Sequence, residues 1–304
     1  MLTRRQLLIG GAASLVALGT GGFVGVEEGW LPGRVALGRV LGRCDVDAAV
    51  PADEPGELVE HTLSSGHRDR EVTWILALPP GVSSSSLSQH SSALPMVLAL
   101  HGRGGDAHSA FASLGLHRFL AQHVNGGGAP FALVSVDGGD TYWHPRASGD
   151  DPLAMLATEL LPLLAEGGLR TDSIGVLGWS MGGYGALLLA RESGKDSLAG
   201  TRIAAVAAES PALFRSYDDS AAGAFDDEAD FRAWGALVDA PGVGPGTGLM
   251  VSCGDTDAFT DTTRSYRAAV TPTPAGGIGS GCHDNGYWRS QATAQLAFLA
   301  AHLG

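Results

Sequence analysis

One serine lies between two glycines in Gly178-Trp179-Ser180-Met181-Gly182, and this pentapeptide is the chain's clearest candidate for chemistry. An apolar run, SIGVLGW, precedes Ser180, and a helix-like run, MGGYGALLLA, follows it. A tight strand-to-helix turn can hold a serine hydroxyl out above a sheet, and glycines two residues away on each side leave room for that turn. The pattern predicts that Ser180 is a nucleophile. The alternative is a glycine-rich helix start with an incidental serine.

A serine nucleophile needs a base, and the base needs a carboxylate that orients it. In this strand-turn-helix setting the acid follows the serine and the histidine comes last. The base is then His283, the only histidine between residues 252–259 (SCGDTDAF) and the last helical run. For the acid we favour Asp257, because Asp255 directly follows Gly254 and should still belong to the turn. Asp255 stays open as the alternative.

An acyl-enzyme also needs two N–H donors directed at the developing oxyanion. We expect one from the amide of Met181 and the other from the amide of Arg103, in the loop His101-Gly102-Arg103-Gly104-Gly105. His101 is expected to brace this loop. The histidines lack the i, i+4 spacing of zinc peptidases, CxxC is absent, and the loop has no P-loop lysine. We therefore expect no metal and no cofactor.

Three tryptophans are candidates for contacts with a substrate. Trp143 follows an expected strand, whereas Trp179 and Trp288 flank the nucleophile and the base in sequence. Each is interpreted as lining a pocket, and ordinary packing is the alternative for each.

These residues need elements that bring them to one edge of a sheet. Residues 60–80 read as two strands around a turn at Ser65-Gly66, and residues 81–92 as a polar loop. Strands and helices then alternate, which predicts a mostly parallel sheet with helices on both faces. The strands are expected at 95–102, 131–139, 173–180, 203–213 and from 248, and the helices at 107–124, 151–166, 181–193 and 291–303. Ligands bind at the carboxyl ends of such strands.

Residues 214–246 interrupt this alternation with an acidic, glycine-containing segment. It is longer than most connections. Either a small cap over the site or a surface excursion fits it.

The first 30 residues predict an export signal. Arg4 and Arg5 precede an uncharged run, residues 7–26, which is typical of a twin-arginine signal. The run is also about long enough to span a bilayer and lacks a clear Ala-x-Ala site, so an uncleaved anchor in the membrane or cell envelope is the alternative. We divide the chain into a signal or anchor (1–30), a connector (31–56) and a catalytic domain (57–304).

The net charge narrows the classes of partner, and the cysteines allow a disulfide. The formal net charge is −13 and the chain has one lysine, which argues against nucleic acid. Export would permit a disulfide among Cys44, Cys253 and Cys282. Because Cys253 precedes the acid loop and Cys282 precedes His283, we expect these two to be neighbours and to pair; unpaired thiols are the alternative.

The ordered motifs HGRGG, GWSMGGYGA, CGDTDAF and GCHDNGYW resemble those of the α/β-hydrolase superfamily. Within it they are similar to the group of esterase D, feruloyl esterases and secreted actinobacterial mycolyltransferases. The resemblance covers roughly residues 57–304. It implies an α/β-hydrolase fold with a small cap or none, an acyl-serine, no cofactor, catalytic Ser180, Asp257 and His283, and an oxyanion hole at Met181 and Arg103. The mycolyltransferases carry a glutamate at the position of Asp257, and this departure favours an esterase.

Three functions follow as hypotheses. The favoured one is a serine esterase acting on a small-molecule, lipid or sugar ester. An acyltransferase would keep the acyl-enzyme but replace water by an alcohol or sugar acceptor. A non-catalytic binding protein on the same fold would be expected to carry a damaged triad, and this triad is complete in sequence.

Overall fold

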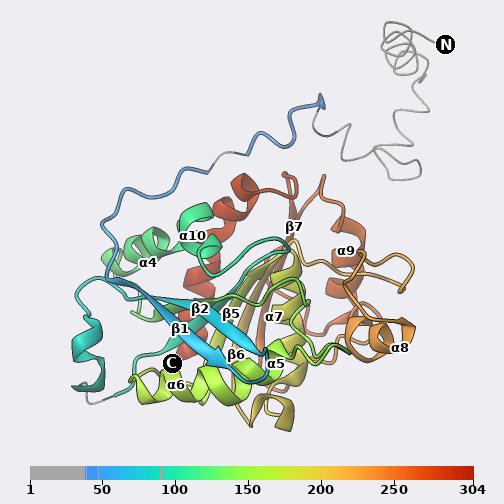
Figure 1. Ribbon diagram of the computed structural model, residues 1–304. Helices are drawn as coiled ribbons and strands as arrows, with labels where there is room; N and C mark the ends of the chain where they lie inside the picture. The colour runs from blue at the N-terminus through green and yellow to red at the C-terminus, as the bar shows by residue number, and fades with distance from the viewer. Residues whose placement is uncertain (1–37, 39, 47, 90–91) are drawn as a thin grey trace, which may run out of the picture.

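The computed structural model describes residues 38, 40–46, 48–89 and 92–304, and its centre is an eight-stranded sheet (Figure 1). The strand order is β1-β2-β4-β3-β5-β6-β7-β8. The strands are β1 (Leu58–Ser65), β2 (Arg70–Ala77), β3 (Met96–Leu100), β4 (Ala132–Val136), β5 (Ser173–Trp179), β6 (Arg202–Glu209), β7 (Gly248–Gly254) and β8 (Ile278–Gly279).

Only β2 runs against the rest of the sheet, since β1 reverses again beside it. β1 pairs with β2 in an antiparallel hairpin, from Leu58 opposite Ala77 to Ser65 opposite Arg70. β2 pairs antiparallel with β4, and every later pair is parallel. The mostly parallel sheet is therefore confirmed. The carboxyl ends of β3 to β7 share one edge, where loops from distant parts of the sequence can meet.

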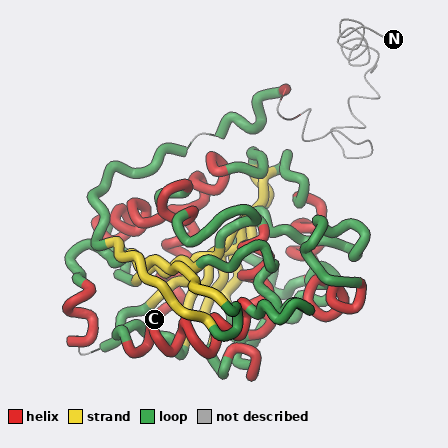
Figure 2. Tube along the Cα trace, viewed as in Figure 1, coloured by secondary structure: helices red, strands yellow, loops and turns green. Residues whose placement is uncertain are grey.

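Helices cover both faces of the sheet. Successive side chains of each buried strand point to opposite faces, so each strand contributes to two cores. In β3, Met96, Leu98 and Leu100 enter one core, whereas Val97 and Ala99 enter the other. Helices α5 (Pro152–Met155), α6 (Leu161–Glu166), α7 (Met181–Glu192) and α9 (Thr260–Ala269) contribute to the first core. Helices α4 (Leu116–Asn125) and α10 (Asn285–Leu303) contribute to the second. Figure 2 shows these helices in red around the yellow strands.

Several expected elements differ in detail. The helix predicted at 107–124 is broken at Gly115, where φ is 70°, into a short π-helical segment η2 (Ser109–Ser113) and α4. The predicted helix at 151–166 consists of α5, a π-helical turn η3 (Leu156–Leu160) and α6. Asp151 caps it, accepting a hydrogen bond from the Ala154 amide at 2.8 Å. The polar loop contains a 3₁₀ helix η1 (Ser84–Gln89), and η4 (Asp196–Leu198) is another.

The segment 214–246, named the cap from here on, packs against α7 and the loop after β4. It carries α8 (Glu228–Asp230) and a π-helical turn η5 (Phe231–Gly235). Its aromatic side chains pack on those of the loop after β4 and of α7, with Phe225 at the centre, 5.9 Å from Tyr142 and 6.0 Å from Tyr184. The carbonyl oxygen of Ala222 also accepts a hydrogen bond from Arg103 Nη2 at 2.8 Å. The cap therefore touches the loop after β3.

The expected signal or anchor at residues 1–30 lies outside the described residues. Within the part that is described, no helix combines the length and the apolar character that crossing a bilayer requires.

Candidate active site

Ser180 occupies a strained turn between β5 and α7. Its φ of 56° and ψ of −120° lie in a region that non-glycine residues rarely adopt. The turn is held because the Ser180 amide donates to the Glu209 carbonyl at 2.9 Å and the Ser180 carbonyl accepts from the Ala212 amide at 2.9 Å. A Cβ atom at Gly178 would collide with the backbone of Gly182. The glycine spacing of the motif is therefore a steric requirement of the turn.

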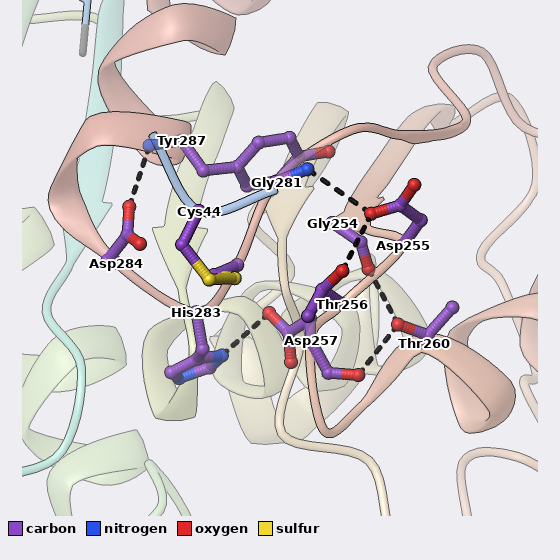
Figure 3. The surroundings of a disulfide bond; sticks show 11 residues. Cys44, Gly254, Asp255, Thr256, Asp257, Thr260, Gly281, His283, Asp284 and Tyr287 are labelled. Carbon is purple, nitrogen blue, oxygen red and sulfur yellow. Dashed lines mark hydrogen bonds and ion pairs between the residues drawn. A yellow bond between two sulfur atoms is a disulfide. The ribbon is translucent and has the colours of Figure 1, made fainter. Parts of the chain in front are cut away.

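Three loops bring Ser180, His283 and Asp257 into one line. His283 Nε2 lies 2.9 Å from Ser180 Oγ, and His283 Nδ1 lies 2.8 Å from Asp257 Oδ2 (Figure 3 shows the second pair). Because a carboxylate only accepts, Nδ1 carries the proton and Nε2 is left to accept from the serine hydroxyl. The Asp257 side chain is fully buried, whereas that of His283 is 31% exposed. This arrangement can transfer a proton away from Ser180.

Asp257, and not Asp255, faces the histidine. The second oxygen of Asp257 accepts from the Phe259 amide at 2.9 Å, which fixes the carboxylate in its loop. Asp255 turns the other way: it accepts from Thr256 Oγ1 at 3.1 Å and from the Gly281 amide at 3.4 Å. The first residue after β7 thus supports the neighbouring backbone, and the third reaches the base.

The two amides predicted to form an oxyanion hole, those of Met181 and Arg103, belong to segments next to Ser180. Met181 is the first residue of α7, so its amide is among those without a partner inside the helix. A Cβ at Gly102 would touch Ser180 Cβ at 3.3 Å, which places the Gly102–Arg103 peptide beside the nucleophile. The amide of Gly104 donates to Asp140 and that of Gly105 to the Gly102 carbonyl. The amide of Arg103 stays the predicted second donor of this loop.

His101 braces that loop. It is fully buried, and its Nε2 accepts from the Gly138 amide at 2.9 Å. Its Nδ1 therefore carries the proton and donates to the Gly102 carbonyl at 2.8 Å. Over the described residues, no group of three or more His, Cys, Asp and Glu side chains is arranged to hold a metal ion.

The tryptophans differ in position. Trp143 is fully buried, and Cβ atoms at Gly138 and Gly185 would overlap its ring. The prediction that Trp143 contacts substrate is wrong, since the loop turns its side chain into the core. Trp179 is 4% exposed and lies 6.4 Å from the partly exposed Trp288, whose ring meets His283 edge-on at 5.1 Å. Trp288 alone of the three borders the site with an exposed surface.

The sequence reasoning missed Phe259. This residue follows the acid loop, and its ring lies 5.4 Å from the His283 ring and 5.6 Å from Phe214 of the cap. The sequence did contain a signal for this contact. Phe259 lies in the loop that carries the acid, and that loop must pass close to the base. Phe259 and Trp288 together border His283 with apolar surface.

A buried carboxyl beneath the site was also missed. Glu209, at the end of β6, is 1% exposed, and Gln295 Nε2 of α10 donates to it. Burial raises the pKa of Glu209 well above its usual value, and the negative charge of Asp257 adds to the effect. Burial therefore favours the neutral form of Glu209, and its backbone carbonyl accepts from the Ser180 amide in the nucleophile turn.

This raised pKa predicts a pH dependence of stability. A carboxyl whose folded-state pKa exceeds the unfolded one stabilises the fold at low pH, and that contribution is lost as pH rises through the folded-state pKa. We expect Glu209→Gln to remove this loss. The free energy of unfolding, measured by urea titration between pH 5 and pH 9, should fall less steeply in the variant, by up to about 1.4 kcal/mol per pH unit. Parallel curves for the two proteins would contradict the neutral state.

The disulfide joins Cys44 to Cys282, 238 residues apart, and the expected Cys253–Cys282 bond is wrong. Cys253 is a free, buried thiol. Cys253 lies buried within β7, whereas Cys282 is bonded to Cys44 of the connector. The loops of Cys253 and Cys282 are neighbours as expected, since the Thr256 amide donates to the Gly281 carbonyl at 3.0 Å.

Comparisons with known proteins agree with this geometry. The family model described as "Putative esterase" matches residues 65–299, which is most of the chain. No curated protein matches the sequence. Among solved structures, a ferulic acid esterase is similar at a TM-score of 0.65 and 19% identity, over 83% of this chain and 100% of that chain.

Two further structures show the same fold. An S-formylglutathione hydrolase from Agrobacterium tumefaciens has a TM-score of 0.65 at 17% identity, over 85% of this chain and 98% of that one. A ferulic acid esterase from Anaeromyces mucronatus has a TM-score of 0.61 at 18% identity, over 85% and 95%. The chain has an α/β-hydrolase fold, belongs to this esterase family and is a carboxylic-ester hydrolase.

Proposed function

We propose that the protein cleaves carboxylic esters through an acyl-serine intermediate formed on Ser180. The observation that carries the proposal is the continuous line from Ser180 Oγ to His283 and on to the buried Asp257, with separations of 2.9 and 2.8 Å. His283 takes the hydroxyl proton as Ser180 attacks the ester carbonyl, and Asp257 stabilises the imidazolium. A binding protein without catalysis has no need of such a line.

The remaining steps use the same groups. The amides of Met181 and Arg103 donate to the oxyanion of the tetrahedral intermediate. His283 then gives its proton to the leaving alcohol, and the acyl group remains on Ser180. Water, deprotonated by His283, attacks the acyl-enzyme and releases the acid. Each proton that leaves the nucleophile is thus returned to a leaving group or to Ser180.

The proposed substrate is a small-molecule ester, with a lipid or sugar ester as the finer expectation. A ferulic acid esterase with this fold has been solved in complex with ferulic acid, and a feruloyl esterase module with sinapinate. In this chain, Phe259 and Trp288 border His283. Their apolar surfaces support an apolar group next to the ester bond. Nucleic acid is not proposed as a partner, because the chain is acidic.

The proposed location is outside the cytoplasm. Arg4 and Arg5 before the uncharged residues 7–26 support export by the twin-arginine route, and a retained segment would tether the enzyme to the membrane or cell envelope.

A panel of p-nitrophenyl esters of increasing acyl length, with and without an acceptor alcohol, tests this function. Hydrolysis predicts equal release of p-nitrophenol and free acid, with little new ester when an alcohol or a sugar is added. An acyltransferase would instead make the new ester as its main product and respond strongly to the acceptor. No release from any ester by folded, oxidised protein would contradict the proposed function.

A further inference from the structure

We propose that the Cys44–Cys282 disulfide positions His283, so that turnover depends on oxidation of this cysteine pair. The inference rests on the proposed function and adds redox regulation of the same active site. Cys282 is 2% exposed and directly precedes His283 in the chain. In Figure 3 the disulfide at Cys44 lies beside His283 and the Asp257 loop.

The loop that carries His283 has little regular structure of its own. It spans residues 280–284, between the two-residue strand β8 and the start of α10. The acid loop supports it through the bond from the Thr256 amide to the Gly281 carbonyl, at 3.0 Å. The contact from the Gly281 amide to Asp255 is long, at 3.4 Å. A covalent link at Cys282 is therefore a major restraint on the position of the base.

The other end of the disulfide is itself held by the fold. The carbonyl oxygen of Val46 lies against Gly286 of α10, where a Cβ atom would collide with it. Further along the connector, the Asp53 carbonyl accepts from Arg118 of α4 at 3.1 Å, and Asp53 Oδ1 accepts from Asn125 at 2.9 Å. Figure 1 shows residues 48–56 of the connector running along the outside of the molecule to β1. The disulfide thus ties the base loop to a segment seated on two helices.

Catalysis depends steeply on this placement. His283 must keep both its contacts, at 2.9 Å to Ser180 and 2.8 Å to Asp257. A misplacement of about 1 Å can lower turnover by about a hundredfold. Loss of the covalent restraint should act on proton transfer, which involves His283, and much less on substrate binding.

The redox step has one expected product. Two thiols and oxidised glutathione give the Cys44–Cys282 bond and two molecules of reduced glutathione, so the cysteines lose two electrons and two protons to the oxidant. Burial raises the pKa of the Cys253 thiol well above its usual value, so this group lacks the thiolate that exchange requires. In a reducing compartment the pair stays reduced, and in an oxidising one it closes.

The test compares oxidised protein with protein reduced by dithiothreitol, and both with Cys44→Ser. Thiol alkylation and mass spectrometry establish each redox state, and thermal melts establish the folded fraction. We expect reduction or Cys44→Ser to lower kcat about ten- to a hundredfold, with KM within about twofold. Oxidised glutathione should restore the reduced wild type and leave Cys44→Ser low. The control Cys253→Ser should respond to reduction as the wild type does.

Two outcomes would overturn the proposal. One is a kcat in the reduced protein and in Cys44→Ser within twofold of the oxidised wild type. The other is a kcat that falls only in proportion to the folded fraction, which would mean that the bond stabilises the fold without positioning the base. Failure of the esterase function itself would look different, because oxidised wild type would then turn over no ester.

Discussion

Replacement of Ser180 by alanine should lower kcat for ester hydrolysis by at least about 10⁴-fold, because no oxygen remains to form the acyl bond. The methyl group of alanine fits the space of the serine side chain, so KM and the melting temperature should change little. Initial rates on a p-nitrophenyl ester, with thermal melts in parallel, measure this effect.

Ser173→Ala is the matched control for this variant. Ser173 begins the same strand, β5, at the end away from the active site, and its hydroxyl accepts from Arg202. This variant should keep the wild-type kcat. A Ser180→Ala protein with a near-native rate would mean that another group attacks the ester.

Asp257→Asn should lower kcat by about 10³- to 10⁴-fold without unfolding the protein. An asparagine amide would donate to His283 Nδ1, which would place the imidazole proton on Nε2. The ring could then no longer accept the proton of Ser180. Steady-state kinetics of the purified variant, checked against the folded fraction, measure the loss.

Asp255→Asn separates the two acids that the sequence left open. Asp255 contacts Thr256 and the Gly281 amide and has no hydrogen bond to His283 among the described residues. We expect its kcat to stay within about tenfold of the wild type. If Asp255→Asn were the more damaging of the two, Asp255 would be the acid and our assignment would be reversed.

The nucleophile turn was predictable because both of its glycines are required by close backbone contacts. A Cβ atom at Gly178 would collide with Gly182 within the turn, and a Cβ atom at Gly182 would collide with the backbone of Leu100 at the end of β3. The acid and the histidine follow the serine in a fixed order along the chain, and the buried strands alternate with helices. These two patterns indicated the other loops at this edge of the sheet. The sequence therefore predicted which loops meet there.

The pairing of the disulfide and the burial of Trp143 could not be predicted, because no local constraint in the sequence determines either of them. Cys44 lies in a connector without periodic apolar residues, so no pattern indicated that it folds back onto α10. Trp143 lies in a loop with φ of 60°, and such a turn reverses the direction of the side chain. Both errors arose where the path of an irregular segment, rather than the type of residue, decides the contact.

The contacts of the buried polar residues under the site could not be predicted from the sequence either. Glu209 ends a strand whose residues 203–208 are all apolar, and this run alone does not reveal that Gln295 of α10 meets Glu209. The segment 214–246 could be recognised as an interruption. Its role as a packed cap depends on Phe225 reaching Tyr142 and Tyr184, which are distant in sequence.

Labelling with a fluorophosphonate, followed by peptide mapping, tests most directly that Ser180 is a nucleophile activated by His283. The probe forms a covalent bond only with an activated serine hydroxyl. Our account predicts one label per folded, oxidised chain, on the peptide that contains Ser180, and a large loss of labelling in His283→Ala. A label on any other serine, or none on protein that melts cooperatively, would contradict it.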